Sequence, residues 1–497
     1  MNSMDRRQFL RTTALAAGSL GLLSGLTGCQ TPGGGQAVVP TPTTIKPRGA
    51  NEDIRVAVVG FNGRGQDHIG GYNKLKGVRL VALCDVDSKV LGRAVQAQKD
   101  KNKPVTGYTD IRKLLEDPDI DAISIATPNH WHSLAAIWAV QAGKDVYVEK
   151  PVSHNVWEGR QLVNAARKYS RIVQTGTQCR SSNGLIEAIE WLHQGNLGRI
   201  LRARGLCYKR RPSIQKTTGE QKVPETVDYD LWCGPAPKDP LRRAKLHYDW
   251  HWVWPTGNGD LGNQGIHQMD IARWALGEKE LSPRVFSFGG RLGYEDDGTT
   301  PNTLTVVHAY KKAPLIFEVR GLPEKTGTEK MDNYRGAGVG VVIDCENGYV
   351  VIPSYTEAIV YDNKDRKART FKGASDHYQN FIDAVRSRKV ADLHADILEG
   401  HLSSALCHTG NISYRLGKNA SPEQMREKLK GDADALDCLQ RMQTHLGANG
   451  VDLAHTPATF GEFLKMDPKT ERFPGNAKAN QLLTRDYRAP FVVPAKV

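Results

Sequence analysis

Long hydrophobic runs are scarce in this sequence of 497 residues. A helix needs about 20 consecutive apolar residues to cross a bilayer. Beyond residue 30 no segment has such a run, and the one candidate before it, residues 14–26, is short and rich in glycine. The sequence therefore predicts no membrane-spanning helix, and it leaves about 450 residues for two domains or one large two-lobed body.

A pattern of paired cysteines is also missing. The chain has eight cysteines and no Cys-x-x-Cys, and the seven that follow Cys29 are odd in number and widely spaced. This spacing excludes a disulfide framework. It suits a chain that folds in a reducing compartment, where cysteines stay as thiols.

A concentrated basic surface is absent as well, although the formal net charge is +13. The densest basic clusters, "YKRRP" and "LRRAK", are short, and the other basic residues are scattered. Nucleic acid is therefore not an expected partner. His247 and His251 have the i, i+4 spacing of a helical metal site, but no third ligand is evident, so no metal is expected.

The N-terminus carries the three parts of an export signal. Arg6 and Arg7 form a twin-arginine pair, an apolar run follows, and "LTGC" ends at Cys29. This order predicts a twin-arginine signal over residues 1–29 with a lipidated Cys29; the alternatives are a buried helix, or cleavage short of Cys29 that leaves a soluble protein. Residues 30–52 are rich in Gly, Pro and Thr and predict a flexible tether. We expect an exported, periplasmic protein that Cys29 anchors to the membrane.

Short β-branched segments alternate with helical ones from residue 53 onward. The expected strands cover residues 54–60, 79–85, 121–128, 145–151 and 171–176, and the expected helices cover residues 66–76, 88–99, 132–142 and 156–169. Alternation of this kind is typical of a Rossmann-type, doubly wound parallel sheet of the α/β class. We assign this domain to residues 53–178.

A glycine-rich turn follows the first expected strand. It reads Gly60-Phe61-Asn62-Gly63-Arg64-Gly65, which departs from G-x-G-x-x-G in its spacing. Glycines at such a turn let the backbone approach a pyrophosphate at a helix N-terminus. Asp85 ends the next strand, where a carboxylate accepts hydrogen bonds from both ribose hydroxyls and repels a 2′-phosphate. The pattern predicts NAD as the cofactor in preference to NADP; the alternative is a structural turn beside a surface aspartate.

Three later motifs are more specific. Thr127-Pro128-Asn129-His130 follows the third of these strands, Glu149-Lys150-Pro151 follows the fourth, and "GIHQMD" carries His267 and Asp270. With these motifs the chain resembles the Gfo/Idh/MocA oxidoreductases, the family of glucose–fructose oxidoreductase and inositol dehydrogenase. The resemblance covers roughly residues 54–415.

The resemblance implies a second domain, over residues 179–417, of the α/β type with an open, mostly antiparallel sheet. That sheet often makes subunit contacts in the family, so a homo-oligomer is expected. Residues 418–497 form an extension beyond the family's usual core. The expected NAD-binding residues are Gly60, Asn62, Gly63, Arg64, Gly65, Asp85, Thr127, Pro128, Asn129, His132, Glu149 and Lys150.

Lys150 and His267 are the expected catalytic residues. Oxidation of a secondary alcohol develops negative charge on oxygen, which Lys150 can stabilise, and releases a proton, which His267 can accept. A helix is expected over residues 263–276, which places Asn263, His267 and Asp270 on one face. Asp270 is then expected to orient the imidazole or to raise its pKa.

Asn263 departs from the family pattern. Inositol dehydrogenase-like members have an aspartate at that place, four residues before the histidine. An amide can hydrogen-bond a substrate hydroxyl but cannot relay a proton. The usual aspartate–histidine relay is therefore in doubt in this chain.

The expected substrate is a carbohydrate. Three tryptophans and two histidines lie within residues 247–260, and aromatic rings stack on the apolar faces of sugars; aromatic packing at a domain seam is the alternative. From this stretch and the resemblance, the expected substrate-binding residues are Gln178, Arg180, Tyr208, Lys209, His251, Trp252, Asn263 and Asp270.

Three functions remain open from the sequence. The first is an NAD-dependent oxidoreductase that acts on a secondary hydroxyl of a carbohydrate or glycoside and recycles a tightly bound cofactor. The second is an NAD-dependent glycoside hydrolase that works through transient oxidation and elimination, as some exported relatives do. The third is an exported sugar-binding protein without turnover.

Overall fold

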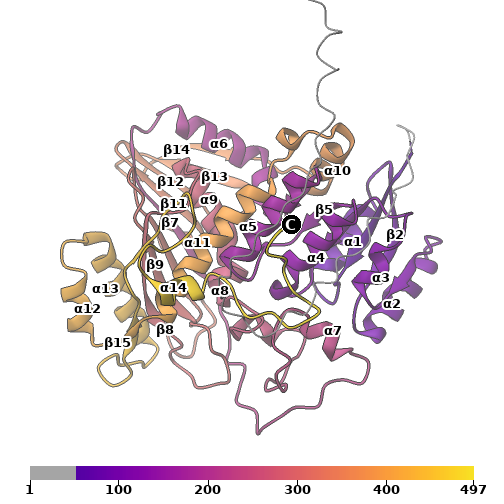
Figure 1. The fold of residues 1–497 in the computed structure, drawn as a ribbon. Helices are drawn as coiled ribbons and strands as arrows, with labels where there is room; N and C mark the ends of the chain where they lie inside the picture. The colour runs from indigo at the N-terminus through magenta and orange to yellow at the C-terminus, as the bar shows by residue number, and fades with distance from the viewer. Residues whose placement is uncertain (1–51) are drawn as a thin grey trace, which may run out of the picture. The chain divides into compact units, whose positions relative to one another are not determined.

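The computed structural model describes residues 52–497 (Figure 1). The signal over residues 1–29, its Cys29 and nearly all of the expected tether lie outside the described residues, so these assignments stay predictions. Within the described part, no helix is both long enough and apolar enough to cross a membrane.

The first sheet is wholly parallel and confirms the expected Rossmann-type domain. Its strands lie in the order β3-β2-β1-β4-β5-β6, and every recorded pair is parallel. The strands are β1 (Ile54–Val59), β2 (Val78–Cys84), β3 (Thr106–Tyr108), β4 (Ala122–Ile125), β5 (Asp145–Val148) and β6 (Val173–Thr175). The order runs outward in both directions from β1 and β4, so the loops after these two strands open a crevice at the carboxyl edge.

The helices of this domain are α1 (Gly65–Tyr72), α2 (Ser88–Lys99), α3 (Ile111–Leu115), α4 (Asn129–Gln141) and α5 (Val156–Lys168). The helix expected over residues 66–76 stops at Tyr72, four residues early. Residues 73–77 instead form a turn that ends at Gly77, whose φ of +68° lies in the left-handed region. Such a residue turns the chain out of a helix and into the next strand.

The second sheet is mixed and mostly antiparallel, as expected. Ten of its eleven strands follow the order β14-β13-β12-β11-β7-β10-β9-β8-β16-β15, and β17 pairs with β8. Only β10 and β7 pair in parallel. The strands are β7 (Ile200–Tyr208), β8 (Arg284–Gly290), β9 (Thr303–His308), β10 (Leu315–Arg320), β11 (Val339–Cys345), β12 (Gly348–Ile352), β13 (Glu357–Tyr361), β14 (Lys367–Lys372), β15 (Lys418–Ala420), β16 (Ala458–Phe460) and β17 (Leu464–Lys465).

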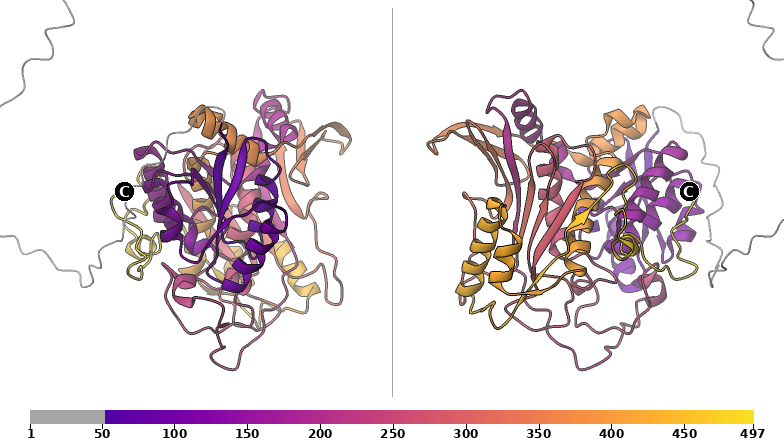
Figure 2. Two further views of the ribbon diagram at one scale, coloured as in Figure 1. Left: turned by 90° about the vertical axis from the view of Figure 1, so that its right-hand side faces the viewer. Right: turned by 60° about the vertical axis from the view of Figure 1, so that its left-hand side comes forward.

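Helices cover both faces of this sheet (Figures 1 and 2). One face packs against helices that bury the main core, and the opposite face packs against helices of the C-terminal extension. The first group is α6 (Asn183–His193), α8 (Gly259–Asn263), α9 (Gly265–Leu276) and α11 (Ile397–Arg415), and the second is α12 (Pro422–Lys428) and α13 (Ala433–Ala448). The remaining α-helices of the described chain are α7 (Tyr229–Cys233), α10 (His377–Ser387) and α14 (Ala477–Gln481).

The last residues of the chain return to the Rossmann domain. After α14 the C-terminal segment passes across the helices of that domain (Figure 1). There Phe491 and Val493 are 1% and 3% exposed and belong to the domain's core. The ring centroid of Phe491 lies 5.5 Å from that of Trp131 at the start of α4. The extension therefore contributes to the packing of both domains.

Candidate active site

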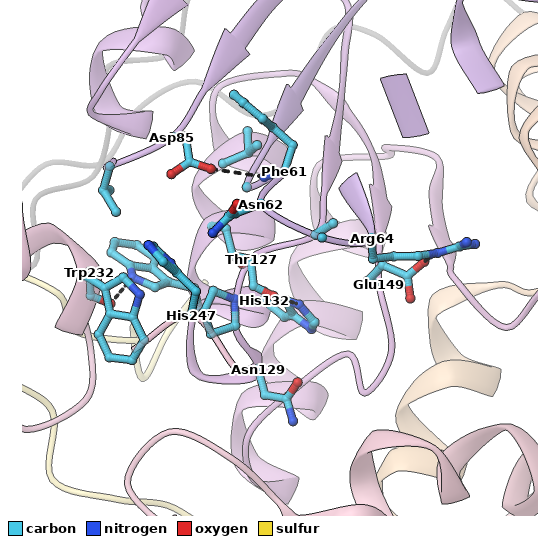
Figure 3. Close-up of a pocket in the computed structure, with 18 of the residues that line it drawn as sticks. Phe61, Asn62, Arg64, Asp85, Thr127, Asn129, His132, Glu149, Trp232 and His247 are labelled. Carbon is cyan, nitrogen blue, oxygen red and sulfur yellow. Dashed lines mark hydrogen bonds and ion pairs between the residues drawn. The ribbon is translucent and has the colours of Figure 1, made fainter. Parts of the chain in front are cut away.

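A pocket of about 350 Å³ opens at the carboxyl ends of β1, β2, β4 and β5 (Figure 3). The expected cofactor residues gather there from four separate loops. Those that line the pocket are Gly60, Asn62, Gly63, Arg64, Asp85, Thr127, Pro128, Asn129, His132, Glu149 and Lys150. Gly65 is not among the lining residues and begins α1 directly beside them.

The glycine turn fits a dinucleotide. Gly60 has a φ of +75°, and a Cβ atom there would lie 2.8 Å from the backbone of Thr127. A Cβ on Gly65 would lie 2.1 Å from the carbonyl oxygen of Gly60. A Cβ on Gly63, in contrast, would meet nothing within 4 Å. The turn is thus packed tightly against the protein at Gly60 and Gly65, and it is open at Gly63. Close approach of a pyrophosphate to the backbone requires such an open side.

Asp85 stands at the end of β2 and faces the pocket. Its carboxylate accepts hydrogen bonds from the backbone N–H groups of Phe61 and Asp87, at 3.1 and 3.0 Å. Burial raises the pKa of this carboxyl above its usual value, although the two N–H groups oppose the rise. Since a carboxylate accepts several hydrogen bonds, Asp85 can still accept from ribose hydroxyls. Nearby, the buried Oγ1 of Thr127 has no hydrogen-bond partner within residues 52–497 and is free to bind a ligand.

Glu149 anchors the opposite side of the glycine turn. Its carboxylate accepts hydrogen bonds from Arg64, His68 and Gln178, at 3.1, 3.2 and 3.2 Å. Burial would raise the pKa of Glu149, but His68, Arg64 and Lys150 together hold it well below its usual range. The side-chain N–H groups of Gln178 donate to both Glu149 and Tyr147. Gln178 was expected to bind substrate directly, and in this arrangement it acts on the site through Glu149.

Lys150 extends from the end of β5 to the second domain. Its Nζ donates a hydrogen bond of 2.8 Å to the backbone carbonyl of Asn263, so two of its three N–H groups stay available. Burial lowers the pKa of the ammonium, although the charge of Glu149 opposes this. His132 supports the same region, because its ring bridges the carbonyls of Thr127 and Pro151 at 2.7 and 2.6 Å.

His267 lies on α9, with 5% of its surface exposed, and it is not among the residues that line the pocket, although Asn263, four residues before it, is. Its Nδ1 has no hydrogen-bond partner in the described part of the chain. Burial holds the pKa of this imidazole well below its usual value, and the positive charge of Lys150 adds to the effect. The ring is therefore neutral at pH 7 and able to accept a proton.

Asp270 does not act on His267, and that expectation was wrong. Its carboxylate accepts two hydrogen bonds from Arg180, at 2.8 and 2.9 Å, and one of 2.7 Å from Ser403. The pKa of His267 is lowered, not raised. The helix was also expected to include Asn263, but α8 ends at that residue and α9 begins only at Gly265.

Arg180, Asp270 and Tyr208 do not line the pocket. Arg180 and Asp270 form a buried ion pair. The Oη of Tyr208 donates a hydrogen bond of 2.9 Å to Glu318. Side chains alternate between the faces of a strand, and Tyr208 lies on the face of β7 that α13 covers. Their expected role as substrate ligands has no geometric support.

Two of the remaining expected substrate residues, His251 and Asn263, line the pocket. His251 donates through Nδ1 to the carbonyl of Tyr248 at 2.5 Å, and burial lowers its pKa to about 3. Trp252 does not line the pocket, and the guanidinium of Arg211 lies 5.1 Å from the centroid of its ring. Lys209 does not line the pocket either, and its Nζ donates a hydrogen bond to the side-chain oxygen of Gln264.

A segment that the sequence did not single out as a whole forms one wall of the pocket. Residues 223–252, here called the strap, leave the second domain and cross the cofactor site. Six of its residues line the pocket, namely Leu231, Trp232, His247, Tyr248, Trp250 and His251. Trp232 and His247 lie on one side of the glycine turn, and Arg64 with Glu149 on the other (Figure 3). The aromatic stretch from His247 was visible in the sequence, whereas nothing local marked Trp232.

The strap is fastened on one side to the turn after β2. The backbone N–H of Ser88 donates to the carbonyl of Thr226 at 2.8 Å, and that of Asp228 donates to Val86 at 3.0 Å. His247 adds a hydrogen bond of 3.0 Å to the carboxylate of Asp87. This turn directly follows Asp85, so the strap meets the Rossmann domain beside the expected ribose site.

The start of α4 holds the other side of the strap. The Nε1 of Trp131 donates to the carbonyls of Leu231 and Trp232, at 2.9 and 3.1 Å. The C-terminal segment adds Arg488, which donates to the side chain and the carbonyl of Asp230 at 2.8 and 2.7 Å. The strap thus bridges the pocket from side to side.

Family comparisons agree with this architecture. Residues 54–177 match the model of the oxidoreductase family with an NAD-binding Rossmann fold, known as GFO_IDH_MocA. Residues 194–306 match the model of the C-terminal alpha/beta domain of the same family, GFO_IDH_MocA_C2.

Among individual relatives, a glycosyl hydrolase family 109 protein of Saccharopolyspora erythraea is 31% identical over 212 residues, which cover 41% of this chain and 46% of that protein. A protein of the same name from Shewanella sp. (strain W3-18-1) is 30% identical over 213 residues, covering 40% of this chain and 45% of the relative. The chain therefore spans about half the length of the curated relatives it matches.

Solved structures share the fold at low identity. The WlbA dehydrogenase from Bordetella pertussis, in complex with NADH and UDP-GlcNAcA, has a TM-score of 0.53 and 21% identity, covering 71% of this chain and 94% of that chain. A levoglucosan dehydrogenase in complex with NADH has a TM-score of 0.55 and 19% identity, covering 72% and 95%. Two regions of the chain, residues 54–177 and 194–306, thus match the models of the NAD-binding Rossmann domain and the C-terminal α/β domain of the Gfo/Idh/MocA oxidoreductases, and the solved structures share the fold.

Proposed function

We propose that this protein is an NAD-dependent enzyme that oxidises a secondary hydroxyl of a carbohydrate or glycoside and keeps its nucleotide between turnovers. The observation that carries the proposal is the strap, which crosses the nucleotide pocket and is fastened on both sides. Two structural neighbours, whose names state complexes with NADH, support the cofactor. Their names also point to sugar-like substrates.

The side chains around Lys150 supply the chemistry of alcohol oxidation. NAD, when bound in this pocket, supplies the hydride acceptor for such a reaction. The neutral imidazole of His267 accepts the proton of the substrate hydroxyl. The ammonium of Lys150, held in place by the carbonyl of Asn263, donates a hydrogen bond to the substrate oxygen as negative charge develops there.

Asn263 limits how the proton leaves His267. The family's relay through an aspartate has no equivalent here, because the side chain at this position is an amide. The ring of His267 is buried, and the positive charge of Lys150 disfavours its protonated form. A proton held for a short time and then returned to the substrate suits such a site better than release to solvent.

Glycoside cleavage is the second candidate, and relatives named as glycosyl hydrolase family 109 proteins favour it. Oxidation of a sugar hydroxyl to a ketone acidifies the neighbouring C–H, so the glycosidic oxygen can leave by elimination. Addition of water and reduction of the ketone then complete a cycle without net redox change. A cofactor that stays bound and a proton that His267 returns to the substrate suit this cycle. They suit equally well a reaction in which one sugar is oxidised and a second sugar is then reduced by the same cofactor.

We also propose that the protein is exported in folded form through the signal at residues 1–29 and tethered by Cys29. An exported enzyme has no ready supply of fresh nucleotide. A cofactor loaded before export and held by the strap would meet that need.

Nucleotide content tests the proposal directly. The protein is purified in folded form without added nucleotide and denatured, and NAD and NADH are quantified by mass spectrometry. Near-stoichiometric nucleotide is expected. A site that is empty and also fails to bind added NAD contradicts the proposal and leaves a sugar-binding protein without turnover. An empty site that binds added NAD contradicts retention alone and leaves an ordinary dehydrogenase.

Paired sugars and chromogenic glycosides then separate the two chemistries. Transfer of hydrogen between two sugars, without added nucleotide, supports the oxidoreductase. Release of the chromogenic group, accompanied by exchange of solvent deuterium into the sugar next to the oxidised carbon, supports glycoside cleavage.

A further inference from the structure

Gln264 joins two other side chains just outside the pocket, and Gln264, Lys209 and Tyr355, none of which lines the pocket itself, are here called the outer wall. It lies between α8 and α9, next to Asn263, whose carbonyl receives Lys150. Its side-chain oxygen accepts a hydrogen bond of 3.1 Å from Nζ of Lys209. Its side-chain nitrogen donates one of 2.8 Å to Oη of Tyr355. One amide therefore fixes a cation from the end of β7 and an aromatic ring from the loop between β12 and β13.

Tyr355 faces the proposed reaction centre. Its ring centroid lies 4.9 Å from that of His267. The ring is 36% exposed, whereas His267 is 5% exposed. The unpartnered Nδ1 of the buried imidazole is a polar atom that a ligand can satisfy. An aromatic face beside such an atom suits a sugar ring, which has apolar faces and polar edges.

Lys209 brings an uncompensated positive charge to this wall. Its two neighbours are paired, since Arg210 contacts Glu329 at 2.5 Å and Arg211 contacts Asp260 at 2.8 Å. Lys209 forms no ion pair with any carboxylate of residues 52–497 and bonds only the neutral side chain of Gln264.

The charge of Lys209 is felt at the reaction centre. Burial is the main cause of the lowered pKa of Lys150, and Lys209 adds to the lowering. Two ammonium groups near one another repel, and at Lys150 the charges of Glu149 and Asp260 oppose the effect of Lys209. The carboxylate of Asp260 is already taken by two hydrogen bonds from Arg211, both of 2.8 Å.

We propose that Gln264, Tyr355 and Lys209 select the saccharide, and that Lys209 binds an anionic substituent on it, either a carboxylate or a sulfate. This inference rests on the proposed function only in taking the site as one for carbohydrate. Tyr355 contacts a face of the sugar ring, and Gln264 is a positioning residue that holds both partners in place.

Binding of matched glycosides tests the inference. Methyl β-D-glucuronide, methyl β-D-glucoside and the 6-sulfate of that glucoside are titrated calorimetrically into the full-length protein with its nucleotide. The anionic glycosides are expected to bind about tenfold more tightly than the neutral one, as a charge-assisted hydrogen bond allows. The stronger of the two anionic ligands identifies the substituent as carboxylate or sulfate. Equal binding of all three, or binding of none, overturns the inference.

Three variants show whether the preference resides in this wall. Lys209→Gln is expected to reduce the anionic preference to within about twofold. Arg210→Gln removes one positive charge from the adjacent residue and is the matched control, because Glu329 already pairs with that arginine; it should retain the preference. Gln264→Glu keeps the size of the side chain but pairs with Lys209, so it should abolish the preference while the protein stays folded. A preference that survives both Lys209→Gln and Gln264→Glu overturns the inference.

The inference and the proposed function fail separately. Nucleotide content and turnover report on the cofactor, whereas the ratio of affinities between anionic and neutral glycosides reports on the wall. A protein that binds NAD without any anionic preference retains the proposed function and loses the inference. A protein that binds the anionic glycosides selectively but does not bind NAD retains the inference and loses the proposed function.

Discussion

Lys150 occupies the place where the two domains meet around the proposed reaction centre. Its Nζ is held by the carbonyl of Asn263, so replacement by methionine should remove a hydrogen-bond donor without leaving a buried charge. We expect Lys150→Met to lower kcat by about 10²- to 10³-fold while nucleotide content stays unchanged. Steady-state kinetics and mass spectrometry of the bound nucleotide measure the two effects.

Lys144 supplies the matched control for that variant. It is a fully buried lysine of the same domain, and its ammonium donates to the carbonyls of Asp117 and Ile120 at 2.7 and 2.9 Å. Lys144→Met should lower thermal stability and leave kcat close to that of the wild type. Equal losses of kcat in both variants would show that Lys150 acts through folding alone.

His267 should determine the acid side of the pH profile. Burial and the charge of Lys150 hold its pKa well below about 6.5, the ordinary value for histidine. Its neutral form is the proton acceptor, so kcat/KM should stay level from pH 8 down through pH 6.5 and fall only at lower pH. In Lys150→Met the acid limb of the residual activity should shift to higher pH, because the positive charge that disfavours protonation of His267 is gone. An acid limb that does not move between the two proteins contradicts this assignment.

The sequence predicted the positions of site residues correctly where those positions depend on neighbouring residues in the chain. It failed for residues whose partners are distant in the sequence. Gly60, Asp85 and Lys150 follow strands directly, and the strand pattern alone places them at one edge. Tyr208 was expected at the substrate from the resemblance alone, which did not say to which face of β7 its side chain would point. Asp270 was misplaced because its partners Arg180 and Ser403 are 90 and 133 residues away.

The strap should control how fast nucleotide leaves. Trp232 lines the pocket, and the carbonyls at Leu231 and Trp232 are bound by Trp131. Trp232→Ala should open this wall and raise the dissociation rate of NADH by about tenfold or more, since removal of one buried aromatic contact typically costs over 1 kcal/mol. Stopped-flow loss of NADH fluorescence, with excess NAD as the trap, measures the rate.

Trp191 provides the comparison for the strap variant. It lies on α6 and packs against Phe371, whose ring centroid is 5.7 Å away, and it does not line the pocket. Trp191→Ala should reduce thermal stability and leave NADH dissociation at the wild-type rate. If both variants speed dissociation equally, the strap is not the element that retains the nucleotide.

At the scale of elements, regular structure was predictable and the strap was not. In the Rossmann domain, β-branched runs predict the strands, and capping residues and terminal glycines predict where the helices begin and end. Residues 223–252 have little regular structure, and their position depends on hydrogen bonds to Asp87 and Trp131 in another domain. No local periodicity encodes such contacts.

The molecule as a whole should lose stability in mild acid. Burial lowers the pKa of His130, His308 and His408 to about 3 and that of His377 to about 4. In the unfolded chain each has a pKa of about 6.5, so the unfolded state binds more protons below that value and stability falls with pH. Each of these histidines should remove about 1.4 kcal/mol of unfolding free energy per pH unit, from about pH 6.5 down to about pH 4.

Denaturant unfolding between pH 7.5 and 5 measures this slope. His308→Leu should reduce it by the contribution of one proton. His455→Gln changes a histidine whose side chain is 88% exposed and should leave the slope unchanged. A slope that is the same in His308→Leu as in the wild type contradicts a neutral, buried His308.

The place of the strap in the chain bears on when nucleotide can bind during synthesis. The parallel sheet is complete when β6 ends at Thr175, the strap follows at residues 223–252, and Arg488, which binds the strap through Asp230, comes later still in the chain. Domains generally fold from the N-terminus as the ribosome delivers them. We therefore expect nucleotide to bind at the exposed carboxyl edge of this sheet before the strap is in place. If the strap retains nucleotide as proposed, the occupancy of the purified protein should report how much nucleotide was available while the chain was folding.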